Sequence, residues 1–125
     1  MSIPENHQTV MPYLMLVGTS SFIEFCREVF GAELLFTRMR EDGETLMHGE
    51  LQIGGSTIMF AEATIEWSPQ KANLFVYVEN ADETYQKALE MGASSIMSPS
   101  NQDYGRACGV SDPFGNIWWV TSIIN

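Results

Sequence analysis

The stretch YGRACGVSDPFGNIWWVT, from Tyr104 to Thr121, is the most informative part of this chain. It contains Asp-Pro followed closely by Gly-Asn, which is strong turn chemistry because Pro113 fixes φ and Gly115 can adopt a positive φ. The runs on either side are β-branched and aromatic, as half-buried strands usually are. The stretch therefore predicts a strand, a tight turn and a second strand.

An earlier stretch, MHGELQIGGSTIMFAEA at residues 47–63, shows the same order of strand, glycine turn and strand. Gly49 matches Gly109, and Gly55 matches Gly115, each at a spacing of 60 residues. The similarity lies in the order of elements and the positions of glycines rather than in residue identity. It predicts an internal repeat.

The repeat continues upstream. Met11–Gly18 parallels Asn73–Asn80 at a spacing of 62 residues, and each segment precedes an amphipathic helix that closes on Gly-Ala. The sequence therefore predicts two copies of a strand–helix–strand–strand–strand module, which together make an α+β fold. We expect a single domain over residues 1–125, with one module at about 10–63, a linker at 64–71 and a second module at about 72–122.

Local signals predict the bounds of the elements. Ser21 with Glu24 forms a capping box for the first helix, and Asn80 with Glu83 marks the start of the second helix. Residues 1–9 are expected to form a loose arm, and residues 99–103 a loop. The predicted strands are Met11–Leu16, Leu34–Arg40, Leu46–Ile53, Thr57–Ala63, Ala72–Val78 and Ser94–Met97, followed by the pair around the turn at Gly115.

Composition excludes several classes of protein. The net charge of −10 argues against nucleic-acid binding, which needs a basic surface. The longest apolar run, Met11–Val17, is too short to span a bilayer, and the first ten residues lack the apolar core of a signal peptide. Cys26 and Cys108 follow no spacing motif, which favours reduced thiols and a cytoplasmic location.

The paired modules, with FCREVFGAE in the first and YGRACGVSDPFGNIWWV in the second, resemble the vicinal-oxygen-chelate superfamily. That superfamily includes glyoxalases, ring-cleaving dioxygenases, fosfomycin-resistance enzymes and bleomycin-binding proteins. MHGELQIGGS and DPFG-x-x-W resemble its PhnB-like branch in particular. The resemblance covers essentially residues 10–122. It implies that each module curls its sheet into a half-barrel, with helices on the convex side and a ligand cavity enclosed by the concave sides.

Enzymes of that superfamily usually hold a divalent metal with His, Glu or Gln from the first and last strand of each module. Met and Trp do not ligate Mg, Mn, Fe or Zn usefully, and a lone Asn is a poor oxygen ligand. We therefore expect no metal and no other cofactor. The four corresponding positions in this sequence are Met11, Met59, Asn73 and Trp119.

Strand alternation predicts which side chains line the cavity, since residues i and i+2 share a face. Met47, Leu51 and Ile53 are expected to pack under the first helix. Trp67, in the linker, is either a lid over the cavity or an anchor on the surface. The predicted lining residues are Met11, Tyr13, Met15, His48, Glu50, Gln52, Met59, Asn73, Phe75, Tyr77 and Trp119, and the spacing of 60 residues adds Arg106, Cys108 and Val110.

Such a cavity is rich in aromatic rings and thioethers, which suits a flat or apolar ligand. His48 and Glu50 form the one predicted pair able to move a proton near neutral pH. The alternative interpretation is structural: His48 would bond to a neighbouring backbone carbonyl, and Glu50 would neutralise Arg106. Arg106 is otherwise suited to hold a carboxylate or phosphate as a bidentate fork.

Two functions follow from these predictions. The first is a glyoxalase- or bleomycin-resistance-like protein that lacks the usual metal site and binds a small aromatic or apolar ligand. The acidic charge would favour a cationic ligand by steering. The second is a metal-independent lyase- or isomerase-type enzyme that acts on a carbonyl compound, with His48 and Glu50 as its acid–base pair. In both cases we expect a homodimer, because a half-barrel leaves sheet edges that pairing buries.

Overall fold

The computed structural model describes residues 1–124, which form two compact units. Unit 1 contains Met1–Arg27 and Gly31–Lys71, and unit 2 contains Glu28–Phe30 and the chain from Ala72 onward. Asn125 lies outside the described residues, so the last residue of the predicted domain is not described. The predicted module and linker boundaries stay predictions. No helix within residues 1–124 is long and apolar enough to cross a membrane.

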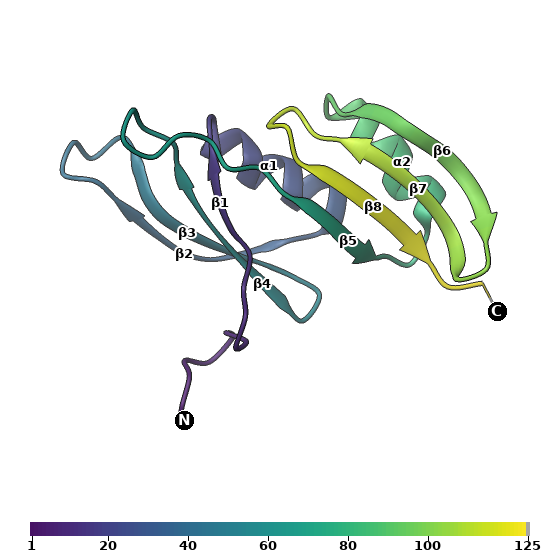
Figure 1. The fold of residues 1–125 in the computed structure, drawn as a ribbon, viewed down its shortest axis with the longest axis horizontal. Helices are drawn as coiled ribbons and strands as arrows, with labels where there is room; N and C mark the ends of the chain where they lie inside the picture. Colours follow the sequence, from purple (N-terminus) through teal and green to yellow (C-terminus); the bar gives the residue numbers. More distant parts are fainter. Residues whose placement is uncertain (125) are drawn as a thin grey trace. The chain divides into compact units, whose positions relative to one another are not determined.

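Unit 1 is a four-stranded mixed sheet with the strand order β1-β4-β3-β2, accompanied by helix α1 (Figure 1). β1 runs parallel to β4, and the other neighbouring strands are antiparallel. The elements are β1 (Tyr13–Leu16), α1 (Thr19–Phe30), β2 (Glu33–Met39), β3 (Leu46–Ile53) and β4 (Ser56–Glu62).

Unit 2 repeats this plan with the strand order β5-β8-β7-β6, and α2 packs on β6, β7 and β8 (Figure 1). Both units have the predicted order of elements, so the predicted α+β fold built from two strand–helix–strand–strand–strand copies is confirmed. The elements are β5 (Asn73–Tyr77), α2 (Ala81–Glu90), β6 (Ser94–Gln102), β7 (Gly105–Ser111) and β8 (Ile117–Ser122).

The core of unit 1 lies between α1 and one face of its sheet. The rings of Phe22 on α1 and Phe60 on β4 meet edge to face, with their centroids 5.2 Å apart. Leu14 is registered with Phe60 and is buried on the same face. We call the opposite face of each sheet, which carries Tyr13 and Met59 in unit 1, the open face.

The start of α1 differs from the predicted capping box at Ser21 and Glu24. The helix begins at Thr19, after Gly18 in the left-handed conformation, and no local side chain caps it. Glu62 at the end of β4 replaces the local cap, because its carboxylate accepts hydrogen bonds from the backbone N–H groups of Gly18 and Thr19, both at 2.9 Å. A carboxylate at this position also complements the helix dipole.

The predicted start of α2 is confirmed. The side chain of Asn80 accepts a 3.1 Å hydrogen bond from the backbone N–H of Glu83, as an Asx N-cap does. The predicted loop at residues 99–103 is wrong, because β6 continues to Gln102 through two irregularities in its pairing with β7. The local signal failed there because Pro and Ser lie on an edge strand, where proline is tolerated.

The turn between β7 and β8 forms as predicted, with Gly115 at a φ of 91°. Buried Asp112 holds this turn. Its carboxylate accepts hydrogen bonds from the backbone N–H groups of Phe114 and Asn116, both at 2.9 Å, and from the indole of Trp118 at 2.8 Å. Trp118 itself is buried in the core of unit 2.

The two modules differ by one residue in the third strand. Met59 and Trp119 are equivalent at a spacing of 60, but the residues registered with them are Glu50 and Gly109, at a spacing of 59. The chain from Gly109 to Trp119 is therefore one residue longer than the chain from Glu50 to Met59. Because a shift of one residue moves every side chain of a strand to the other face, the prediction that Arg106, Cys108 and Val110 face the cavity is wrong. The three side chains lie on the helix side of β7.

Candidate functional site

The open face of unit 1 carries a row of side chains across all four strands. Tyr13 is registered with Met59, Met59 with Glu50, and Glu50 with Phe36. Residues that are registered in this way share a face of the sheet. The row therefore places an acidic side chain between thioether and aromatic neighbours, as the strand alternation predicted for Tyr13, Glu50 and Met59.

A hydrogen-bonded network links four side chains on this face. His48 Nε2 lies 2.8 Å from Glu50 Oε2, and His48 Nδ1 lies 3.2 Å from the hydroxyl of Tyr13. His7 Nε2 lies 2.9 Å from the other oxygen, Glu50 Oε1. A neutral His48 with its proton on Nε2 donates to Glu50 and accepts from Tyr13, so both ring nitrogens are satisfied.

The network stabilises the ionised form of Glu50. Burial opposes ionisation, but the hydrogen bonds from His7 and His48 outweigh this effect, so the pKa of Glu50 is lowered. The carboxyl group is therefore an acceptor near neutral pH. Its partners are the imidazoles of His7 and His48 rather than Arg106, which was the partner that the sequence suggested.

The N-terminal arm supplies part of this network, although the sequence predicted a loose segment. The side-chain amide of Gln8 donates to the carbonyl of Thr57 at 2.9 Å and accepts from its N–H at 3.3 Å. The hydroxyl of Thr57 donates to the backbone carbonyl of Asn6. Together with His7, these contacts hold the arm against β3 and β4, and they leave Thr57 fully buried.

A pocket of about 790 Å³ lies beside this network, within unit 1. Tyr13 belongs to both, since its hydroxyl meets His48 and its side chain lines the pocket. The wall includes two aromatic and two thioether side chains, and Ile65 and Trp67 on it are exposed. The lining residues are Tyr13, Met15, Arg40, Met47, Ala61, Thr64, Ile65, Glu66 and Trp67.

Several of these lining residues were missed or misplaced by the sequence analysis. Met47 was expected under the helix, yet it lines the pocket and is 39% exposed. The reason is a break in the pairing of β2 and β3, where Arg38 is registered with His48 and Met39 with Leu46, which leaves Met47 as an extra residue. Such a bulge reorients a side chain and has no sequence signal of its own here.

The linker at residues 64–71 also contributes. Gln70 pairs with Met15 through two backbone hydrogen bonds of 3.1 and 2.9 Å, so the segment returns along β1. This return places Trp67 on the pocket wall. Of the remaining predicted residues in unit 1, Met11 precedes β1 and is half-buried, and Gln52 is half-buried on β3, registered with Thr57.

The open face of unit 2 carries aromatic side chains, and no hydrogen-bonded network like that of Glu50 joins its described residues up to Ile124. Phe75 and Tyr77 on β5 are exposed, with ring centroids 5.1 Å apart. The indole N–H of Trp119 donates a 3.2 Å hydrogen bond to Asn73 Oδ1. The six-membered ring of Trp119 covers Gly109, because a Cβ built on that glycine would lie 2.6 Å from it. The four residues of β5 and β8 that the sequence predicted to line the cavity thus share the open face. They are Asn73, Phe75, Tyr77 and Trp119.

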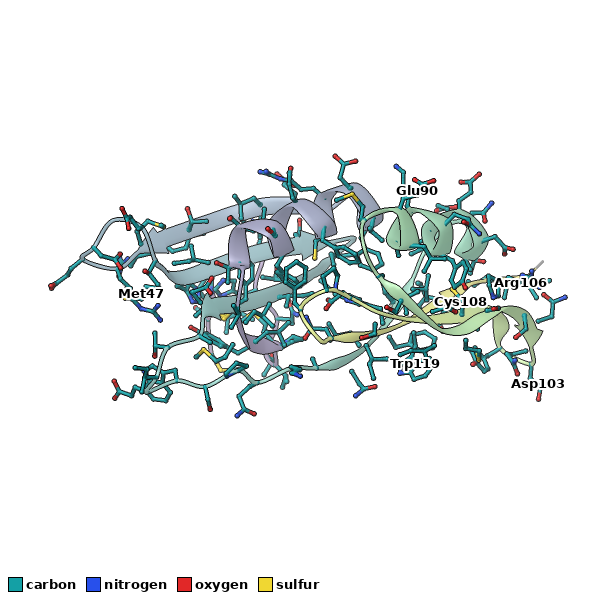
Figure 2. The ribbon with its side chains drawn as sticks, turned by 90° about the horizontal axis from the view of Figure 1, so that it is seen from above. Met47, Glu90, Asp103, Arg106, Cys108 and Trp119 are labelled. Atoms are coloured by element: carbon teal, nitrogen blue, oxygen red, sulfur yellow. The ribbon has the colours of Figure 1, made fainter. Side chains whose placement is uncertain are left out.

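Arg106 and Cys108 lie on the helix side of β7 instead (Figure 2). Arg106 forms a bidentate pair with Asp82 on α2, with nitrogen–oxygen distances of 2.9 and 3.0 Å. The thiol of Cys108 lies 3.8 Å from the carbonyl of Ala81, and burial raises its pKa to about 11. A guanidinium already paired in this way and a protonated, buried thiol lend no support to a ligand-binding role.

The residues at the family's metal positions do not fit a divalent cation. In unit 1 these positions hold the thioethers of Met11 and Met59. In unit 2 they hold Trp119, which has no ligating atom, and Asn73, whose oxygen accepts from Trp119. Elsewhere in residues 1–124, no group of three or more His, Cys, Asp or Glu side chains has a metal-binding arrangement.

The repeated strand–helix–strand–strand–strand plan places the chain in a class of α+β proteins built from paired modules. The chain belongs to the Glyoxalase/Bleomycin resistance protein/Dioxygenase superfamily, whose family model matches residues 19–120. This finding confirms the superfamily that the sequence motifs predicted.

Known proteins with related sequences or folds agree with this assignment. Uncharacterized protein Mb0911c from Mycobacterium bovis is 29% identical over 119 residues, covering 86% of this chain and 78% of its own length. TnmS3, an antibiotic binding protein from Streptomyces sp. CB03234, superposes with a TM-score of 0.71 at 19% identity and 99% coverage of both chains. A PhnB protein from Bacillus cereus, titled a putative 3-demethylubiquinone-9 3-methyltransferase, gives a TM-score of 0.69 at 15% identity, covering 92% of this chain and 99% of its own. These likenesses establish a shared fold.

Proposed function

We propose that this protein binds a small ligand with a flat, apolar body, without a divalent metal, in the pocket of unit 1. The observation that carries the proposal is the wall of that open pocket of about 790 Å³, where Tyr13, Met15, Met47 and Trp67 are among the lining residues. Aromatic rings offer stacking surfaces, and methionines adapt to irregular shapes. The antibiotic-binding neighbour TnmS3 supports a binding role for this fold.

The absence of a metal is part of the proposal and rests on the donor set at Met11, Met59, Asn73 and Trp119. Elemental analysis of the dialysed protein is expected to find far less than one equivalent of Zn, Mn, Fe or Ni. A value near one equivalent would contradict the proposal, because the protein would then hold a metal ion that these four side chains do not ligate.

The binding test uses N-phenyl-1-naphthylamine, a neutral dye that becomes fluorescent in apolar sites. Trp67→Ala is expected to weaken its binding by about 10- to 100-fold, as truncation of a buried aromatic contact commonly does. Trp119→Ala is the matched comparison, since it removes an indole from the open face of unit 2. If Trp119→Ala has the larger effect, the ligand site is on unit 2. If the dye does not bind at all, the binding function itself is wrong.

A second candidate function is favoured by the hydroxyl of Tyr13, which joins the pocket wall to His48 and, through it, to Glu50. We propose as the alternative a metal-independent lyase or isomerase acting on a carbonyl compound, with His48 and Glu50 as the acid–base pair. His48→Gln keeps a hydrogen-bonding side chain but cannot titrate. It is expected to reduce turnover about 10²- to 10⁴-fold with little effect on binding if the alternative holds.

Two further predictions accompany the proposed function. We propose that the protein is a homodimer in the cytoplasm. Edge strands β2 and β6 each have one unpaired side, which favours association. Light scattering at micromolar concentration is expected to give twice the mass of one chain, and the mass of a single chain would contradict this prediction.

A further inference from the structure

One basic side chain among the described residues lines the pocket of unit 1, and its guanidinium is only partly used. Arg40 Nη2 donates a 3.0 Å hydrogen bond to the carbonyl of Glu62. Arg40 Nη1 is buried, and no acceptor within residues 1–124 bonds to it. A buried charged N–H group without an acceptor is costly, so such groups mark sites where an ion, water or ligand supplies the missing oxygen.

The main chain holds Arg40 in place. Its N–H donates to the carbonyl of Thr45 at 2.8 Å, and its carbonyl accepts from the N–H of Gly43 at 2.9 Å. With the backbone fixed at the turn between β2 and β3 and Nη2 bonded to β4, the position of Nη1 is determined. The site is therefore organised before any ligand enters, which lowers the entropic cost of binding.

The two carboxylates that act electrostatically on Arg40 are both engaged elsewhere. Glu62 accepts from Gly18 and Thr19 at the start of α1. Asp42 accepts from the N–H groups of Glu44 and Thr45, at 2.9 and 2.8 Å, and these bonds, with that of the Thr45 hydroxyl, lower its pKa to about 2. Neither carboxylate supplies the acceptor that Nη1 lacks.

Glu66 is the acidic residue of the pocket wall, and it is exposed. Among the hydrogen bonds of the described residues, none joins Glu66 to Arg40. The net charge of −10 repels anions at long range. Selection of an anion must therefore come from contact with Arg40 inside the pocket, where charge-assisted hydrogen bonds are strong.

We propose that the pocket of unit 1 selects ligands that carry an oxyanion, such as a carboxylate or sulfonate, on an aromatic body, with the oxyanion paired to the guanidinium of Arg40. The inference deepens the proposed function and rests on it. It replaces Arg106, which pairs with Asp82, by Arg40 as the residue that binds an anionic group. It also reverses the expectation of a cationic ligand that the net charge alone suggested.

The test compares two dyes with the same ring system. 8-Anilinonaphthalene-1-sulfonate carries a sulfonate, and N-phenyl-1-naphthylamine lacks it. In Arg40→Met, which keeps an unbranched side chain without charge, the sulfonate dye is expected to lose about tenfold or more in affinity, while the neutral dye changes less than twofold. Arg27→Met, an exposed arginine on α1, is the matched control and is expected to change neither affinity.

Arg40→Met also removes the bond to Glu62, so Arg40→Lys serves as a second variant. A single ammonium keeps the charge but not both nitrogen positions, and an intermediate loss for the sulfonate dye is expected. Equal losses for both dyes, or an unchanged preference in both Arg40 variants, would overturn the inference while leaving the pocket intact. If neither dye binds the wild-type protein, the proposed function fails together with the inference.

Should both variants fail to fold, the wild-type protein still provides a test. In ¹⁵N-resolved spectra of the arginine side chains, the sulfonate dye is expected to shift one guanidinium signal that the neutral dye leaves unchanged. Identical responses to the two dyes would overturn the inference.

Discussion

The hairpins β3–β4 and β7–β8 follow the same plan, yet they give the two open faces different chemistry. In unit 1 the third strand presents Glu50 beside Met59, and in unit 2 the equivalent residue is Gly109 beside Trp119. The chain between the registered residues is one residue longer in unit 2, which accounts for the different spacing. The matched glycines consequently serve opposite faces, since Gly49 makes room for Phe60 in the core and Gly109 makes room for Trp119 on the open face.

This difference shows how an internal repeat can diverge in surface chemistry without changing its fold. A one-residue difference in hairpin length exchanges the two faces of a strand, and the open faces carry a titratable network in unit 1 and aromatic side chains in unit 2. The helices and the order of strands persist. The comparison can be tested first at the two glycines, where the largest effects are expected.

Gly49→Ala is expected to destabilise the protein by about 2–3 kcal/mol, and Gly109→Ala by about 1 kcal/mol, because overpacking costs depend on how far the neighbours can move. A Cβ at either position would lie 2.6 Å from a ring. Phe60 is fully buried and cannot move, whereas the ring of Trp119 is on the open face. Urea unfolding monitored by circular dichroism measures both values.

Gly55→Ala is the control for this pair, since Gly55 has nothing within 4 Å of its built Cβ and no positive φ. A change of less than about 0.5 kcal/mol is expected there. If Gly109→Ala costs as much as Gly49→Ala, Trp119 is held as rigidly as a core residue, and the two faces are less different than the structure indicates.

The turns themselves provide the next comparison. Gly115→Val is expected to cost about 1–3 kcal/mol, because a β-branched residue is strained at a φ of 91°. Gly55→Val, in the shorter turn of unit 1, lacks this strain and is expected to cost clearly less. Unfolding midpoints of the two variants give the comparison directly. Equal midpoints would mean that the positive φ of Gly115 carries no energetic cost for a side chain.

The helix caps differ in the same way, because α1 is capped by a charge from β4 and α2 by the local side chain of Asn80. Glu62→Gln and Asn80→Ala are each expected to cost about 1 kcal/mol at neutral pH. The losses of stability in the two variants should differ in their pH dependence. Burial raises the pKa of Glu62, but the hydrogen bonds from Thr19 and Gly18 outweigh this effect and lower it below its usual value.

A lowered pKa in the folded state sets the sign of the effect. The contribution of Glu62 is present above its unfolded pKa of about 4.5 and is lost as the pH falls through the folded value. The stability difference between wild type and Glu62→Gln is therefore expected to shrink below about pH 4.5, whereas that for Asn80→Ala stays constant. Denaturant unfolding at several pH values measures this, and parallel curves for both variants would contradict the assignment.

The sequence predicted most of the fold because its signals are local. The glycine spacing revealed the repeat, and Asn80 with Glu83 marked a helix start that the structure confirms. The errors arose where a distant residue or a one-residue shift decides the outcome. Glu62 caps α1 from a strand 43 residues away from Thr19, and no pattern around Ser21 indicates this. The spacing of 60 holds for β4 and β8 but not for their neighbours.

The candidate site was less predictable than the fold, for the same reason. Alternation placed Tyr13, His48 and Glu50 on one face, but it could not reveal the bulge that turns Met47 toward the pocket. Arg40 and Trp67 reach the pocket wall from a turn and from the returning linker, where no periodicity applies. Pairing of Arg106 with Asp82 depends on tertiary contact between α2 and β7, which a single sequence does not encode locally.

The smallest expected effect concerns the N-terminal arm, for which unit 2 has no counterpart. His7→Gln removes an imidazole that meets Glu50 at 2.9 Å, with the two side chains 17% and 13% exposed. The expected loss of stability is below about 1 kcal/mol, because the entropy lost in ordering the arm offsets much of the free energy gained from the His7–Glu50 pair. Hydrogen exchange resolves this local change better than global unfolding, and residues 6–8 are expected to exchange faster in the variant.

Lowering the pH should likewise make residues 6–8 of the wild-type protein exchange faster. Since hydrogen bonds from both histidines lower the pKa of Glu50 despite its burial, the contribution of its carboxylate is present above the unfolded pKa and is lost as the pH falls through the folded one. Glu5→Gln, an exposed change in the same segment, is the control and should leave exchange unaltered. If His7→Gln leaves residues 6–8 as protected as in the wild type, the contacts of Gln8 and Asn6 with Thr57 hold the arm. The network on Glu50 would then be a feature of the sheet alone, and the two open faces would differ by their strands and not by the arm.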